Sequence, residues 1–61
     1  MSITDEMREE AERYLNFLIA EYAALGKSGY LSLNIILLPL KKRLDNFGMD
    51  KELYDEIMSL E

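Results

Sequence analysis

The residues of this chain that could take part in catalysis or metal binding are mostly carboxylates. Asp and Glu together number 12 among 61 residues, and the chain has no histidine and no cysteine. Glu6 and Glu10 lie four residues apart, as do Glu9 and Arg13, so each pair shares one face of a helix. Carboxylate metal sites in helical bundles use such spacings, but they place the glutamates on a buried face and add histidines. We therefore predict a solvated face with ion pairs, and neither a metal nor another cofactor.

Nucleophilic catalysis requires an activated group with a base beside it. The chain has serines but no histidine or cysteine, and Lys41 and Lys42 belong to a basic cluster that we expect to be solvated. Neither a phosphate-binding loop nor a dinucleotide-binding fingerprint is present in the sequence. These absences predict that the protein is not an enzyme.

The net charge of −5 is unevenly distributed along the chain. Residues 1–26 carry −4, residues 27–44 carry +4 and residues 45–61 carry −5. Phosphate binding needs clustered lysine and arginine, which an acidic chain lacks. A helix-turn-helix DNA reader would also need a polar and basic second helix, whereas the segment after the predicted turn begins with Tyr30, Leu31, Ser32 and Leu33. We expect no direct binding to nucleic acid.

The longest apolar run, residues 30–40, is 11 residues long and is interrupted by Ser32 and Asn34. A membrane-spanning helix needs about 20 residues. The first residues also lack the positive charge and apolar run of a signal peptide. An in-plane membrane helix over residues 30–43 is the alternative, but its polar face is thin and acidic segments flank it. We expect no membrane partner and a cytoplasmic location, which the absence of cysteine suits.

The elements that must position these residues are predicted by apolar side chains that recur at helical spacing in three segments. The first helix is expected from Asp5 to Leu25, with Thr4 as its N-cap and Gly26 after its end. The second is expected from Tyr30 to Phe47 and the third from Lys51 to Leu60, capped by Asp50. The fold class is therefore all-α, a helical hairpin plus a short third helix in one small domain over residues 1–61.

The second segment is the most ambiguous of the three because it contains Pro39. Proline removes a backbone donor and clashes with the preceding turn, so a kink is expected near residues 35–38. The alternation of apolar and polar residues from Leu31 to Ile35 also resembles a strand. We predict a helix whose core stripe is Leu33, Ile36, Leu37, Leu40, Leu44 and Phe47, and leave open whether it is kinked or broken at Pro39.

A second apolar face on this helix, formed by Leu31, Ile35 and Leu38, has no neighbour within the predicted hairpin. A chain of this size is close to the lower limit for independent folding, which favours association. We therefore predict a homo-oligomer, a symmetric dimeric helical bundle, since twofold dimers are the commonest closed assembly. Tyr30 and Tyr54 are further candidates for this interface because tyrosine is enriched in protein contacts.

Two classes of function fit these features. The first is a small non-enzymatic regulatory or adaptor protein that binds a protein partner through a helical face. The second is an acidic inhibitor that mimics nucleic acid on a host or defence protein, by analogy with phage-encoded antagonists. The second class predicts a continuous acidic surface of Glu6, Glu9, Glu10, Asp55 and Glu56, whereas the first predicts an exposed apolar patch.

Overall fold

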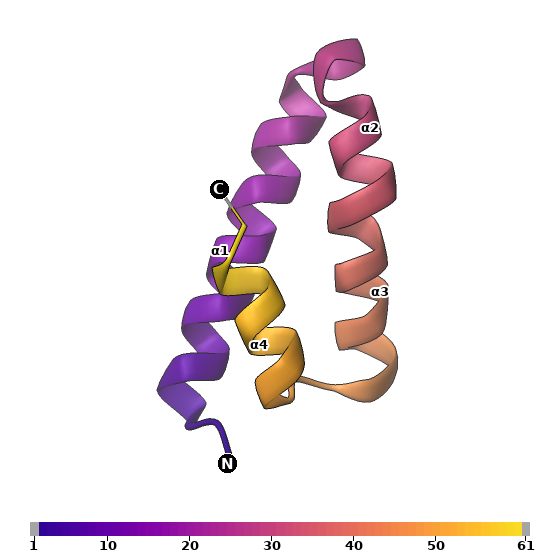
Figure 1. Cartoon of the computed structure of the whole chain (residues 1–61). Helices are drawn as coiled ribbons and strands as arrows, with labels where there is room; N and C mark the ends of the chain where they lie inside the picture. The colour runs from indigo at the N-terminus through magenta and orange to yellow at the C-terminus, as the bar shows by residue number, and fades with distance from the viewer. Residues whose placement is uncertain (1, 61) are drawn as a thin grey trace.

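The computed structural model describes residues 2–60, and every regular element in this range is helical. The elements are α1 (Asp5–Ala24), the 3₁₀ turn η1 (Gly26–Gly29), α2 (Tyr30–Ser32), the π-helical η2 (Leu33–Leu37), α3 (Leu38–Phe47) and α4 (Lys51–Met58). Because α2, η2 and α3 follow one another without interruption, they form one long second arm, which runs antiparallel to α1 (Figure 1). The prediction of an all-α hairpin with a short third helix is confirmed.

Local sequence signals fix both ends of α1. The Thr4 hydroxyl accepts a hydrogen bond from the Met7 amide at 3.1 Å, and Asp5 and Glu6 occupy the first turn, where the helix dipole favours negative charge. The helix ends at Ala24, one residue before the expected end, and Gly26 follows with a φ of 63°. Glycine adopts this left-handed conformation without steric cost, so the chain reverses direction there.

The turn between the two arms packs closely against α1 at Gly29. This residue is buried, and a Cβ atom added to it would lie 2.3 Å from the carbonyl oxygen of Tyr22. Only glycine permits such a close approach of two backbones. The second arm therefore begins in direct contact with the end of α1.

The second arm passes through Pro39 without breaking. The Leu38 amide donates to the carbonyl of Leu33, five residues earlier, which makes the turn before the proline π-helical. Proline has no N–H to offer, and in a regular α-helix its ring would clash with the carbonyl four residues before it, here that of Ile35. The wider turn relieves that clash and keeps the arm helical. The alternation from Leu31 to Ile35 does not form a strand.

The core lies where α1, the second arm and α4 meet. Its buried members are Ala11, Leu15, Leu18, Leu37, Leu53 and Ile57. The last two belong to α4 and are completely inaccessible to solvent, so this short helix is an essential part of the core. As predicted, Asp50 caps α4, its Oδ1 lying 2.7 Å from the Leu53 amide. In Figure 1, α4 covers the lower part of α1 and leaves the upper part of the hairpin without a third helix.

Candidate protein-binding surface

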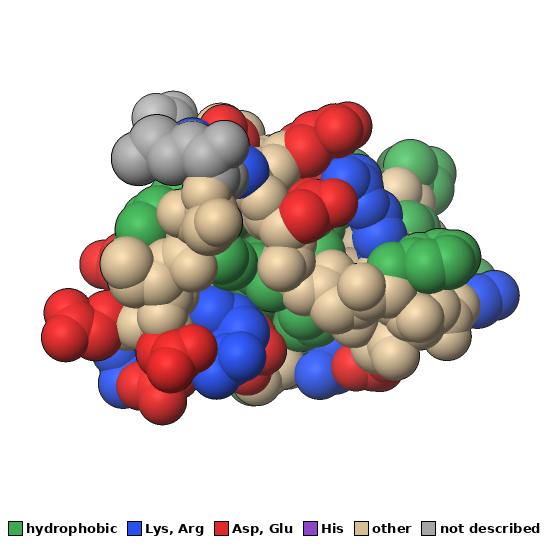
Figure 2. Space-filling view, turned by 90° about the horizontal axis from the view of Figure 1, so that it is seen from below, with side chains coloured by type: hydrophobic (Ala, Val, Ile, Leu, Met, Phe, Trp, Pro, Cys, Tyr) green, Lys and Arg blue, Asp and Glu red, His purple; other side chains and the backbone are tan. Residues whose placement is uncertain are grey.

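The charged residues are concentrated at one end of the hairpin. Between Tyr14 and Leu40 the only charged residues are Glu21 and Lys27. We call residues 14–40 the apolar end, and residues 2–13 together with 41–60 the charged end. All ion pairs within the described range lie at the charged end. Figure 2 views the molecule from this end, where acidic and basic side chains occupy much of the surface.

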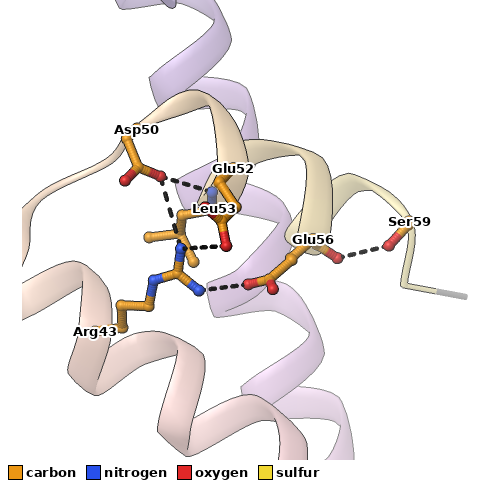
Figure 3. A network of polar contacts seen from close by, with 6 residues as sticks. All are labelled: Arg43, Asp50, Glu52, Leu53, Glu56 and Ser59. Carbon is orange, nitrogen blue, oxygen red and sulfur yellow. Dashed lines mark hydrogen bonds and ion pairs between the residues drawn. The ribbon is translucent and has the colours of Figure 1, made fainter.

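At the charged end, Arg43 connects the second arm to α4 (Figure 3). Its Nη1 lies 2.6 Å from Glu56 Oε2. Its Nη2 lies 3.8 Å from Asp50 Oδ1 and 3.7 Å from Glu52 Oε1. Exposed ion pairs each contribute little to stability, but one guanidinium shared by three carboxylates forms a network with defined geometry. Arg43 therefore fixes the position of α4 against α3.

Large apolar side chains remain exposed at the apolar end. Leu31 is 67% exposed, Ile35 68% and Leu38 40%. Leu31 belongs to α2, Ile35 to η2 and Leu38 to α3, so the three follow one another along the second arm. Leu33 and Leu37 of the same arm pack toward the core, whereas these three side chains remain exposed. We call Leu31, Ile35 and Leu38 the outer stripe.

The two tyrosines that were predicted as contact residues lie in different parts of the molecule. Tyr30 is 62% exposed at the start of α2, next to the outer stripe. Tyr54 lies on α4 at the charged end, with its hydroxyl 3.4 Å from Glu10 Oε1 and its ring centre 5.8 Å from Lys51 Nζ. The structure does not bring Tyr54 to the outer stripe, because α4 folds back onto the first half of α1 to bury its own apolar side chains.

The predicted acidic surface is divided between two elements. On α1, Glu6, Glu9 and Glu10 line a shallow hollow together with Arg13. On α4, the two acids have basic partners: Asp55 Oδ1 lies 2.6 Å from Lys51 Nζ, and Glu56 is bound by Arg43. The α4 carboxylates are thus neutralised within the chain, and the α1 carboxylates share their hollow with an arginine.

Sequence reasoning assigned two residues to the core stripe that the structure leaves exposed. Ile36 is 45% exposed and Phe47 85% exposed. Ile36 is exposed because α4 ends before it can cover this part of the second arm. Phe47 is the last residue of α3, beyond the contact with α4. On the first helix, Leu25 has the spacing of the apolar stripe but is 52% exposed, and Phe17, which sequence reasoning did not single out, is 61% exposed. The sequence feature that could have indicated an exposed apolar surface here is the near absence of charge from Tyr14 to Leu40.

Within residues 2–60, no group of Asp and Glu side chains is arranged so that it could hold a metal ion. No helix of the same range has the length and apolar character needed to cross a bilayer. Compared with protein-family models, with curated protein sequences and with solved structures, the chain shows no significant match.

Proposed function

We propose that this chain is a non-enzymatic regulatory or adaptor protein that binds a protein partner through the outer stripe and Tyr30. The observation that carries the proposal is the exposure of Tyr30, Leu31 and Ile35, each more than 60% accessible, on one side of the apolar end. Large exposed apolar patches on small proteins mark interaction sites. The chain uses these side chains to bury apolar area on its partner.

The composition of the apolar end supports a protein partner over a polyanion. Binding of nucleic acid requires clustered basic side chains, whereas Lys27 is the only basic residue between Tyr14 and Leu40. The core of a protein interface is depleted of charge and enriched in aromatic and large apolar residues, which matches this surface. Asn34 adds little cost of burying polar groups in such an interface, because its side-chain amide already donates a hydrogen bond to the Tyr30 carbonyl at 2.8 Å.

In the absence of another partner, the proposal is that two copies cover the outer stripe as a symmetric dimer. A twofold interface places the same patch of each copy against the other, so a patch that is apolar throughout is compatible with itself. The charged ends then lie outside the interface, where their carboxylates remain hydrated.

Mimicry of nucleic acid by the acidic residues is the alternative function. In its favour, Glu6, Glu9 and Glu10 project from neighbouring turns of α1 and line one hollow. Against it, Asp55 and Glu56 are already paired with basic side chains of the same chain. We therefore place the partner at the apolar end.

Site-specific photocrosslinking in the native cell distinguishes these functions. A photoreactive phenylalanine analogue at Ile35 should give a discrete adduct with one protein, identified by mass spectrometry. The same analogue at Glu52, whose side chain is 78% exposed at the charged end, is the matched control and should give no adduct. An adduct that forms from Glu9 but not from Ile35 would contradict the proposal and favour the acidic inhibitor.

A further inference from the structure

We infer that the groove between α1 and the second arm, beyond the end of α4, binds an amphipathic helix of a partner protein. This surface lies on the side of the hairpin where α4 packs and adjoins the outer stripe where Ile35 and Ile36 line a common hollow beside Leu60. The inference goes beyond the proposed function, because it assigns a second binding surface and the chemistry of its ligand.

The chain itself shows what this groove accepts, because α4 already fills its lower part. Leu53 and Ile57 insert between α1 and the second arm and are completely buried. The next residue of the stripe, Leu60, is half-buried, and its carbonyl accepts a hydrogen bond from the Tyr14 hydroxyl. The spacing of these three side chains, four and then three residues, is that of one helix face. A helix with this spacing is thus the form of ligand that the groove walls fit.

The same groove continues past Leu60 and is open there. A hollow of about 120 Å³ is lined by Leu18, Tyr22, Ser32, Ile36, Leu37 and Leu60. Leu18 and Leu37 form a floor that is almost completely buried, and Ile36 stands at one rim with 45% of its surface exposed. The lining is apolar except for the Ser32 hydroxyl and the Tyr22 phenol. An aliphatic side chain of a docked helix would fill this hollow as Ile57 fills the groove below.

The α1 rim indicates the charge of the docked helix. Glu10 contacts Tyr54 of α4 and Tyr14 contacts Leu60 just after it, and Phe17 and Glu21 continue the same row of α1 at helical spacing. Phe17 is 61% exposed and offers apolar contact area. Glu21 is the only acidic residue of the apolar end. A lysine or arginine flanking the aliphatic stripe of the ligand would pair with it, so the ligand is a basic amphipathic helix, bound by the helix-in-groove mode.

Two neighbouring isoleucines differ in their relation to this hollow. Ile36 lines it, whereas Ile35 belongs to the outer stripe, is 68% exposed and meets Ile36 only in a second, more open hollow beside Leu60. Both are partly or largely solvent-accessible, so a glutamate at either position leaves the buried core intact. The pair provides a matched test, with equal changes of size and charge at a residue that lines the 120 Å³ hollow and at its neighbour outside it.

The probe is a fluorescent peptide of about 15 residues, the length at which isolated helices begin to persist in water. Its leucines occupy positions i, i+4 and i+7, and lysines flank this stripe on both sides. A peptide of the same composition, with its leucines spread around the helix, is the control for non-specific attraction to an acidic protein. Binding is measured by fluorescence anisotropy against the full chain and its Ile36→Glu, Ile35→Glu and Glu21→Gln variants.

We expect saturable binding of the amphipathic peptide, weakened about tenfold or more by Ile36→Glu, since an isoleucine contact is lost and a charge enters the groove. Glu21→Gln should weaken it by a smaller factor that disappears at high salt. Ile35→Glu should weaken peptide binding several-fold less than Ile36→Glu while reducing self-association, because Ile35 lies outside the 120 Å³ hollow. Nuclear magnetic resonance shifts on adding peptide should be centred on Leu18, Tyr22 and Leu60. Absence of saturable binding, equal binding of the control peptide, or equal effects of the two isoleucine variants would overturn the inference.

Discussion

The two ends of the hairpin use similar helices for different purposes. At the charged end, α4 covers the groove, Leu53 and Ile57 are completely buried, and Arg43 bridges three carboxylates. At the apolar end, no third helix covers the hairpin within residues 2–60, and Leu31 and Ile35 are about two-thirds exposed. Hydrophobic side chains of both ends contribute to the buried core, but only at the apolar end do several large ones also remain available for contacts on one arm.

This difference explains why the charges are distributed as they are. Charged side chains at the end that folds on itself keep its outer surface hydrated and add ion pairs around α4. An apolar end with only Glu21 and Lys27 can be buried against a partner without the cost of desolvating many charges. Apolar residues are about equally frequent in α1 and in the second arm. Whether such a residue is buried in the fold or left for a partner therefore depends on whether α4 reaches it.

The largest expected difference between the ends comes from the same substitution made at each. Leu53→Ala removes a completely buried side chain and should lower the free energy of unfolding by about 2–5 kcal/mol. Leu31→Ala, at a position 67% exposed, should change it by less than about 0.5 kcal/mol in dilute solution. Urea denaturation followed by circular dichroism measures both. Equal losses would show that the outer stripe is part of the folding core.

Replacement of Pro39 tests how the π turn positions the outer stripe. With alanine the arm can form a regular α-helix, which should raise stability by roughly 1–3 kcal/mol and the melting temperature by several degrees. Conversion of the π turn to an α turn would shift the register of the arm by one residue, which would rotate Leu31, before the turn, relative to Leu38, after it, by about 100°. Partner binding or dimerisation should then fall while stability rises. A variant that gains stability and keeps its full assembly would contradict this role for the turn.

A smaller effect is expected at the Arg43 network. Arg43→Gln keeps much of the side-chain stem but removes the charge shared by Glu56, Asp50 and Glu52, and should cost about 1 kcal/mol. The loss should shrink in 1 M salt, because salt screens the exposed pairs of the unmodified chain. Thermal melts at low and high salt measure this. A loss that is independent of salt would indicate that Arg43 acts through packing of its aliphatic stem.

Signals confined to a few neighbouring residues predicted much of the fold. Thr4 and Asp50 cap their helices as expected, and Gly26 and Gly48 follow the ends of α1 and α3. These signals are reliable because a cap is satisfied within one turn of its own helix. The positions of the three helices could therefore be predicted to within one or two residues.

Features that depend on contacts between distant segments could not be predicted in this way. Ile36 has the spacing of a core residue, but its burial depends on how far α4 extends along the groove. Tyr54 was grouped with Tyr30 by residue type alone, and only the direction in which α4 folds back separates them. The π turn was likewise out of reach, since Pro39 is compatible with a kink, a break or a wider turn.

Sedimentation equilibrium tests most directly whether the outer stripe joins two copies of the chain while the core beneath α4 holds the fold. At micromolar concentration the unmodified chain should give twice its mass of 7.1 kDa, and Ile35→Glu should return it to a single chain with an unchanged circular dichroism spectrum. Phe47→Glu, which changes an apolar residue 85% exposed at the charged end, should leave the dimer intact. A monomeric unmodified chain, or a dimer that dissociates on Phe47→Glu and persists in Ile35→Glu, would contradict the account.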